Sequence, residues 1–263
     1  MMYQKSFFLA TALFFSVYAY SEFDVSLFYS DYNNIMLELY HDLDAKISNE
    51  ERQCVSKTGG SPVYGEILFD SVNFLLNQLQ LTKNDVFYDL GSGLGKFVVH
   101  VYLMTPTKKS VGIEFSQSRY KRATSIQAKV PKVYNQTFKS ENSMRKMFDQ
   151  SPLVKTKGKK FEFINDCMLS TDISDATVVF TCSTCFELEF MYKLANKLAD
   201  IDNLRIITLK KFPYHEHIHY VTKYTLSMTW SQDVPVYMYK VDKSKVAPAV
   251  DDTQDAEKIN VAA

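Results

Sequence analysis

The sequence has few cysteines, no net charge and no internal repeat. Its four cysteines in 263 residues are too few and too clustered for a disulfide framework. Lysine and arginine together number 30, as do aspartate and glutamate, so no overall basicity indicates a nucleic-acid partner. Any such contact needs a local basic patch. With 46% hydrophobic and 23% charged residues, the chain has enough core-forming residues for one globular domain.

An almost entirely apolar stretch lies close to the amino terminus. It follows Lys5 and ends before Ala19, a pattern typical of a secretory signal peptide over residues 1–19. The stretch is shorter than the roughly 20 apolar residues that span a bilayer. We therefore expect an exported or secreted protein with no stable membrane association after the signal is cleaved. The alternatives are an uncleaved anchor or a hydrophobic helix that packs on the domain.

The rest of the chain is organised around a glycine-rich stretch. Residues 86–90 are a short run of strand-forming residues, and residues 96–104 carry a helical pattern that stops before Pro106. Between them lie three alternate glycines, Gly91, Gly93 and Gly95, which let the backbone turn tightly and approach a ligand with no Cβ in the way. A strand, a glycine turn and a helix form the βα unit of nucleotide-binding folds.

The spacing of these glycines differs from the dinucleotide fingerprint G-x-G-x-x-G. Asp89 stands just before them, and Glu114 ends the next expected strand, where it can hydrogen-bond both ribose hydroxyls of a nucleotide-type cofactor. A glycine loop can be a plain structural turn, but an acid at strand spacing favours a cofactor site. The combination resembles the S-adenosylmethionine (SAM) loop of the seven-stranded methyltransferases.

The remaining pattern predicts an α/β, Rossmann-like, seven-stranded methyltransferase sheet with a helical lead-in. We expect the lead-in and a flexible link over residues 20–62, the domain over 63–243 and a disordered tail over 244–263. Residues 130–160 are expected to form an insertion. After the βα unit, helices are predicted at 116–128 and 187–199, and strands at 161–164, 177–180, 204–209, 220–230 and 234–241.

A second segment makes the resemblance specific. By itself, Tyr64-Gly65-Glu66 is a turn and a helix start, with Glu66 favourable near the positive helix end. Together with the loop after Asp89 and with Glu114, it resembles the disruptor-of-telomeric-silencing (DOT) family of non-SET histone-lysine methyltransferases, which act on the nucleosome core. The resemblance runs from about residue 63 to residue 239 and lapses in the expected insertion.

The resemblance implies SAM as cofactor, with the Tyr-Gly-Glu segment as a lid over its methionine end. Asp166, after the strand at 161–164, resembles the acid that accepts from the adenine amino group, with Cys167 or Met168 against the ring. Lys96 stands where family members often have glutamine. The cofactor-binding residues implied are Tyr64, Gly65, Glu66, Asp89, Gly91, Ser92, Gly93, Gly95, Glu114, Asp166 and Cys167.

The resemblance also implies an acceptor pocket. Cys182 and Ser183 replace two asparagines of the family, Phe186 keeps an aromatic residue, and Tyr237 lies at the family's spacing from Trp230. Cys182, Ser183, Phe186 and Tyr237 are therefore the implied catalytic residues. The Cys-x-x-Cys pair formed with Cys185 is alternatively a redox pair or half a metal site. However, neither a thioredoxin-like context nor a second cysteine pair accompanies it.

Two further clusters contain residue types that occur in binding sites. His215, His217 and His219 would share one face of a strand, but no other ligand at suitable spacing joins them, and we predict no metal site. Lys155 to Lys160 form a basic run, which is either an exposed loop or a patch for an anionic partner such as nucleic acid.

These patterns predict a monomeric, SAM-dependent protein-lysine N-methyltransferase, with a histone in the nucleosome core as the first candidate acceptor. Aromatic walls such as Phe186 and Tyr237 suit this chemistry, because they attract the methylated cation. The missing asparagines predict a weaker or altered preference for nucleosomes. The alternatives are another protein or small molecule as acceptor, or a degenerate SAM-binding module. A histone acceptor would place the protein in the nucleus instead of outside the cell.

Overall fold

The computed structural model describes residues 25–137 and 158–246. The predicted signal peptide, residues 138–157 of the expected insertion and residues 247–263 of the expected tail lie outside this part. The described residues form one seven-stranded sheet in the order β3-β2-β1-β4-β5-β7-β6. The predicted seven-stranded α/β fold is thereby confirmed. The strands are β1 (Val86–Leu90), β2 (Lys109–Ile113), β3 (Lys160–Ile164), β4 (Val178–Thr181), β5 (Arg205–Thr208), β6 (Ile218–Met228) and β7 (Ser231–Val241).

Five of these strands are parallel, and β7 and β6 complete the sheet in antiparallel pairing. The chain runs outward through β1, β2 and β3 and then returns to the other side of β1 for β4 and β5. This reversal leaves a crevice outside the carboxyl ends of β1 and β4, which is where parallel α/β sheets bind ligands.

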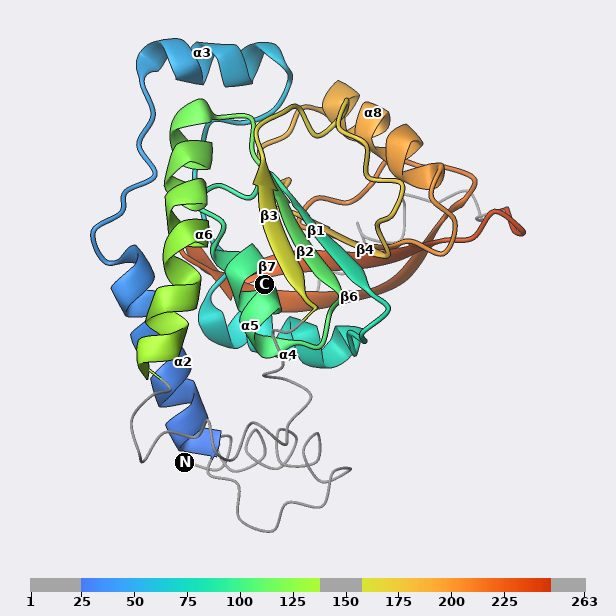
Figure 1. Ribbon diagram of the computed structural model, residues 1–263. Helices are drawn as coiled ribbons and strands as arrows, with labels where there is room; N and C mark the ends of the chain where they lie inside the picture. The colour runs from blue at the N-terminus through green and yellow to red at the C-terminus, as the bar shows by residue number, and fades with distance from the viewer. Residues whose placement is uncertain (1–24, 138–157, 247–263) are drawn as a thin grey trace, which may run out of the picture.

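Helices cover both faces of the sheet (Figure 1). Every residue of β1 is buried, because alternate side chains enter different cores. Tyr88 belongs to the core that α8 covers, and Phe87 to a core with α4 and α5. A third core joins α2, α5 and α6. The helices are α2 (Val25–Tyr40), α3 (Asn49–Lys57), α4 (Phe69–Leu79), α5 (Lys96–Met104), α6 (Gln117–Thr137) and α8 (Leu188–Ala199).

The lead-in differs from the single helical region that we expected. It consists of α2 and α3, separated by residues 41–48, and the side chain of Ser48 caps α3 by accepting from the backbone N–H of Glu51 at 3.2 Å. The expected flexible link is also held in place. The Gly59 carbonyl accepts from the Glu187 N–H at 3.2 Å, and the Pro62 carbonyl accepts from Arg119 at 2.8 Å. The lead-in is therefore packed against the domain.

Helix α6 extends well beyond the expected end at residue 128. It continues through Pro131 to Thr137, although proline removes a backbone donor from a helix interior. Val130 and Val133 are buried on either side of the proline, in the core that α6 shares with α2. Figure 1 shows α2 and α6 side by side. Burial of this shared face favours the longer helix. None of the described helices is long and apolar enough to cross a membrane.

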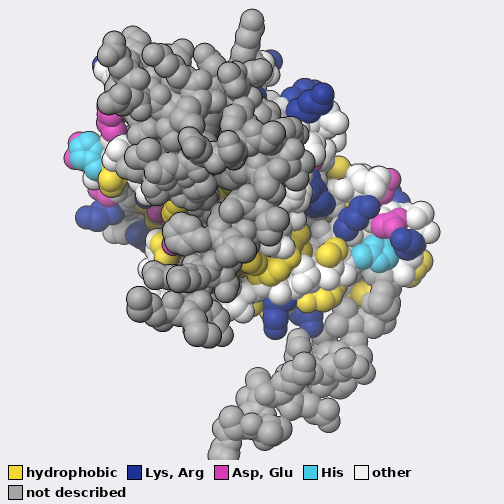
Figure 2. Space-filling view, turned by 90° about the horizontal axis from the view of Figure 1, so that it is seen from below, with side chains coloured by type: hydrophobic (Ala, Val, Ile, Leu, Met, Phe, Trp, Pro, Cys, Tyr) yellow, Lys and Arg dark blue, Asp and Glu magenta, His cyan; other side chains and the backbone are white. Residues whose placement is uncertain are grey.

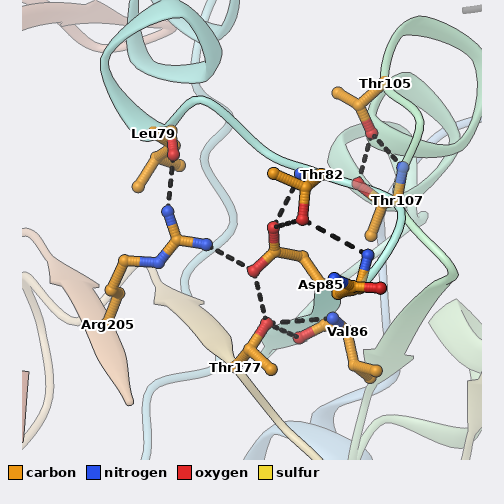
Figure 3. Close-up of polar contacts among 9 residues, drawn as sticks. Leu79, Thr82, Asp85, Val86, Thr105, Thr107, Thr177 and Arg205 are labelled. Carbon is orange, nitrogen blue, oxygen red and sulfur yellow. Dashed lines mark hydrogen bonds and ion pairs between the residues drawn. The ribbon is translucent and has the colours of Figure 1, made fainter. Parts of the chain in front are cut away.

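A polar network ties the strands together at their amino ends (Figure 3). The Asp85 carboxylate accepts from the Thr82 N–H at 2.6 Å, from the Thr177 hydroxyl at 2.9 Å and from Arg205 at 2.5 Å. Arg205 also donates to the carbonyl of Leu79 at the end of α4. The network therefore joins α4, β1, β4 and β5 opposite the ligand crevice.

We predict that Asp85→Asn lowers the free energy of unfolding at pH 7 by about 2–3 kcal/mol, because charge-assisted hydrogen bonds are lost. Burial raises the pKa of Asp85, but its hydrogen bonds and Arg205 outweigh burial and leave the pKa below the ordinary value. The stabilisation is thus complete above about pH 4 and is lost as the pH falls through the lowered pKa.

Urea unfolding of both proteins at pH 7 and at pH 3 measures this difference. The exposed Asp233→Asn change on β7 is the control and should stay within about 0.5 kcal/mol of the unmodified protein. An equal loss at both pH values would show that the Asp85 charge does not stabilise the network.

Candidate active site

A cavity of about 760 Å³ occupies the crevice at the carboxyl ends of the parallel strands. Its wall is built from the loops after β1, β2, β3 and β4, the segment before α4, helix α2 and the turn between β6 and β7. Twelve of the residues predicted from the sequence line it. They are Tyr64, Gly65, Glu66, Asp89, Gly91, Ser92, Gly93, Glu114, Asp166, Cys167, Cys182 and Phe186.

The glycine loop has the tight conformation that its sequence predicts. Gly91 and Gly93 have φ values of +89° and +57°, in the left-handed region that favours glycine. The N–H groups of Gly91 and Ser92 both donate to the carbonyl of Ile113, at 2.8 and 3.0 Å, and so tie the loop to the end of β2. A Cβ on Gly93 would lie 2.5 Å from the ring of Tyr64. The loop and the Tyr64 ring therefore depend on glycine to approach this closely.

Two buried acids lie at the ends of β1 and β2. The Glu114 carboxylate accepts from the N–H groups of Gly93 and Ser116, both at 2.8 Å, and its charge interacts favourably with Arg119. Burial nevertheless raises the pKa of Glu114. Burial also raises the pKa of Asp89 to about 8, and the charge of Glu114 contributes to the rise. Within the described part of the chain, no group donates a hydrogen bond to the Asp89 carboxylate.

These acids fit a cofactor that presents hydroxyl and cationic groups. Each oxygen of Glu114 has further capacity to accept hydrogen bonds, and the Asp89 carboxyl lines the cavity. The Ser92 hydroxyl is buried and has no hydrogen-bond partner among the residues that the structure describes. Buried polar groups of this kind are costly unless they are paired. A bound nucleoside with a positive charge would supply the missing partners.

The Tyr-Gly-Glu segment is held by a cluster of charged and aromatic groups. The Tyr64 hydroxyl donates to Glu66, and burial raises the pKa of Tyr64 so that the phenol keeps its proton. Glu66 also pairs with Lys96 at 2.7 Å. The Lys96 ammonium lies 5.5 Å from the centre of the Tyr40 ring, and the Arg119 guanidinium lies 5.0 Å from that of Tyr64. Ion pairing and cation–π contacts thus position the segment.

The same segment is joined to the turn between β6 and β7. The Thr229 N–H donates to the Glu66 carbonyl at 2.9 Å, and the Leu68 N–H donates to the Ser227 carbonyl at 3.1 Å. Gly65 lies against the Trp230 ring, since a Cβ on Gly65 would be 2.2 Å from a ring carbon. Trp230 therefore lines the cavity beside the Tyr-Gly-Glu segment.

On the expected acceptor side, Cys182, Cys185 and Phe186 line the cavity. Phe186 is largely buried and packs edge-on against Phe190, with ring centres 5.0 Å apart. Burial raises the pKa of Cys182 to about 12, so that it remains a neutral thiol. This protonation state disfavours the alternative role in a reactive redox pair. Among the described residues, no group of three or more His, Cys, Asp or Glu side chains could hold a metal.

Three predicted site residues lie outside the cavity wall. The Ser183 hydroxyl is fully buried, where it bonds to Thr208 at 2.5 Å and accepts from the Lys210 N–H at 3.0 Å. Tyr237 packs against the core that α8 covers. Gly95 caps α5 and faces the ring of Phe163. Each is held by packing or hydrogen bonds that sequence spacing alone does not reveal.

Other residues of the wall were not assigned to the site from the sequence. Tyr32, Met36 and Tyr40, which recur every four residues in α2, line the cavity, although such spacing by itself indicates only a packed helix face. His100 of α5 also lines the cavity, with its ring centre 4.7 Å from that of Tyr32. Burial lowers the pKa of His100 to about 3, which leaves it neutral. Two features of the sequence could have indicated these wall residues. One is the pair of tyrosines on one face of α2, and the other is the histidine in the otherwise apolar helix α5.

The strand order, the glycine loop and the two acids define the SAM-dependent methyltransferase fold of the seven-stranded class. A family model described as "Histone methylation protein DOT1" matches residues 49–247. The chain therefore belongs to the DOT1 family.

Two relatives are named histone-lysine N-methyltransferase, H3 lysine-79 specific. The one from Caenorhabditis elegans is 27% identical over 157 residues, which cover 59% of this chain and 15% of the relative. The one from Drosophila melanogaster is 28% identical over 151 residues, which cover 57% and 8%. The chain thus spans less than a sixth of either relative. The chain is also similar in fold to the crystal structure of an RNA methyltransferase from Salinibacter ruber in complex with S-adenosylhomocysteine. The sequence identity is 18% and the TM-score is 0.46, and the superposition covers 70% of this chain and 98% of the other.

We predict that Asp89→Asn raises the free energy of unfolding at pH 8 by about 1–3 kcal/mol relative to the unmodified protein. Because the pKa of Asp89 is about 8 in the folded state and about 4 in an unfolded chain, the unmodified protein should lose stability as the pH rises from about 4 to about 8. Asparagine cannot ionise and should not show this loss.

Thermal unfolding at pH 4, 6 and 8 tests the prediction, with Asp233→Asn as the exposed control. A stability difference between Asp89→Asn and the unmodified protein that stays constant across this range would contradict the raised pKa.

Proposed function

We propose that this chain is a SAM-dependent protein-lysine N-methyltransferase whose acceptor is a histone lysine. The observation that carries the proposal is the buried pair Asp89 and Glu114, which borders a glycine loop within a cavity lined by Phe186 and Trp230. Membership of a histone methylation family supports the same activity.

SAM would be held by residues from three segments, those after β2 and β3 and the one before α4. Glu114 would accept from the ribose hydroxyls, and Asp166 would accept from the adenine amino group. The backbone N–H of Cys167 donates to Asp166 at 2.7 Å and so orients its carboxylate at the cavity wall. Tyr64 and Glu66 would cover the methionine end. When bound, SAM supplies a methyl group that its sulfonium makes electrophilic.

The protein's part in transfer is to align a neutral amine and to exclude water. Four acids, Glu66, Asp89, Glu114 and Asp166, and two cationic side chains, Lys96 and Arg119, line the cavity. Because Glu66 pairs with Lys96 and Asp89, with a pKa of about 8, is largely protonated at neutral pH, Glu114 and Asp166 are the acids that would attract a lysine ammonium. The ammonium would release its proton to solvent before the neutral amine attacks. Phe186 and Trp230 supply aromatic surface for the lysine stem and for the methylated ammonium. In this proposal Trp230 takes the wall position that the resemblance assigned to Tyr237.

A non-histone protein lysine is the second candidate acceptor. Cys182 and Ser183 stand where the family has asparagines, and the Ser183 hydroxyl is already bonded within the domain. The wall therefore lacks the amide groups found in the histone enzymes, and we expect a weaker or altered preference for nucleosomes.

The described end of the basic run lies away from the cavity. Its described end, residues 158–160, lies at the amino end of β3, whereas the cavity lies at the carboxyl ends of the strands. Lys159 is largely buried, and its ammonium donates to the Thr105 carbonyl at 2.7 Å. The Lys and Arg side chains visible from below are scattered over the described surface (Figure 2). A nucleic-acid contact through residues 158–160 would therefore dock away from the cavity; the rest of the basic run lies outside the described residues.

A histone acceptor places the protein in a nucleus, which is the location that we propose. Export through residues 1–19 stays a prediction, since those residues lie outside the described part. Mass spectrometry of the protein from its native source would find a chain beginning near Tyr20 if a signal peptide is cleaved. An intact Met1 on soluble protein would contradict cleavage.

We predict that Glu114→Ala weakens SAM binding at least about tenfold, because charge-assisted hydrogen bonds are worth about 1.5–3 kcal/mol each. Phe186→Leu should bind SAM normally but transfer methyl groups more slowly, because it loses aromatic surface at the acceptor wall. Calorimetry measures binding, and labelled SAM with nucleosomes, free histones and a cell extract measures transfer.

Glu189→Ala, on the exposed face of α8, is the matched control for the loss of a carboxylate. Unchanged SAM affinity in folded Glu114→Ala would refute the cofactor site. If SAM binds but no acceptor is methylated, the chain is a binding module and not an enzyme.

A further inference from the structure

Exposed apolar side chains gather around the mouth of the cavity. The described part of the chain exposes eleven large hydrophobic side chains, and five of them line this one cavity. Each of the five is at least 40% exposed. We call them the apolar rim; they are Leu37, Val63, Leu68, Phe115 and Trp230. Exposed apolar patches of this kind mark interaction sites, whereas single exposed residues are ordinary.

Much of the rim is fixed in position. Val63 and Leu68 flank the Tyr-Gly-Glu segment, which is hydrogen-bonded to the β6–β7 turn through Thr229 and Ser227. Trp230 stands on that turn and packs on Gly65. These three rim residues therefore belong to one cross-linked unit, and a partner that docks there has less ordering entropy to overcome.

The charges near the rim do not suit a nucleic acid. The two lining cations among the described residues are both engaged within the protein. Lys96 pairs with Glu66 at 2.7 Å, and Arg119 is 4% exposed and donates to the carbonyls of Ala45 and Pro62. Binding to phosphates depends on available Lys and Arg side chains. The Asp166 carboxylate at the cavity wall would repel phosphate further.

We infer that the apolar rim docks the polypeptide that carries the methyl acceptor, and that this polypeptide has apolar side chains next to its target lysine. The inference rests on the proposed function. An acceptor lysine must pass the rim to reach the cavity, so the residues on either side of it come to lie on the rim. Leucine, isoleucine, valine, phenylalanine or methionine at these positions would bury rim surface, whereas arginine or aspartate would lose hydration there.

Two sets of peptides test this inference. One set carries a lysine flanked by leucine, valine or phenylalanine, and the other carries the same lysine flanked by serine, arginine or aspartate. Fluorescence anisotropy measures peptide binding to the protein saturated with S-adenosylhomocysteine, and labelled SAM measures transfer. We expect the apolar set to bind at least about fivefold more tightly than the polar set. We expect its kcat/KM values to be higher by a similar factor.

Matched variants locate the effect. Val63→Ser and Leu37→Ser should each weaken binding of the apolar peptides about three- to tenfold and raise KM, without changing SAM affinity. Val221→Ser and Leu188→Ser remove side chains that are 56% and 60% exposed but do not line the cavity. These two controls should leave peptide binding and transfer unchanged.

The outcomes separate this inference from the proposed function. If peptides of both sets are methylated equally well, or if the control variants lose as much as the rim variants, the apolar rim does not dock the acceptor. Self-association in sedimentation that Val63→Ser abolishes would assign the rim to a second copy of the chain and overturn the inference. If SAM binds but no peptide or protein is methylated, the proposed function itself fails.

Discussion

The burial of two carboxyl groups at the ends of adjacent parallel strands is the constraint on which the site depends. Glu114 is accommodated because the Gly93 and Ser116 N–H groups point at it, and Gly93 can do so only in a left-handed conformation. The absence of a side chain at Gly93 also lets the Tyr64 ring lie against the loop, where a Cβ would collide with it. Asp89 has no such donors among the described residues. Its burial is costly in the free protein and becomes favourable when a cationic ligand binds.

The lead-in is anchored at the same place and so becomes part of the site. Glu51 of α3 accepts from the Ser116 hydroxyl at 2.8 Å and from the Ser118 hydroxyl at 2.6 Å, just beyond Glu114. Arg119, one residue further on, holds the Ala45 and Pro62 carbonyls. The turn that positions Glu114 therefore also fixes α3 over the carboxyl ends of the strands (Figure 1). Helix α2, which lies entirely before the family match, also reaches the cavity wall.

The parts of the fold that could be predicted are those that local sequence determines. The β1 strand, the glycine turn and α5 follow from a run of strand formers, alternate glycines and helical periodicity within residues 86–104. What could not be predicted depends on contacts between distant segments. Pro131 lies inside a helix because Val130 and Val133 are buried there. Trp230 and not Tyr237 reaches the cavity because the β6–β7 turn bonds to the Tyr-Gly-Glu segment, a contact that spacing does not encode.

The replaced asparagines and the apolar rim both bear on how the site would select its methyl acceptor. An amide at position 182 or 183 would offer the acceptor a hydrogen bond, whereas Cys182 presents a neutral thiol and the Ser183 hydroxyl is occupied by Thr208 and Lys210. Orientation of an incoming lysine must then come from shape and apolar contact. Apolar contact discriminates weakly between one lysine side chain and another, because their aliphatic stems are the same. It discriminates strongly against substrates with charged residues next to the lysine, since those residues lose hydration at an apolar surface. Under the proposed function, selectivity for the acceptor would therefore be set by the residues around the target lysine, at the rim, and not by polar groups deep in the cavity.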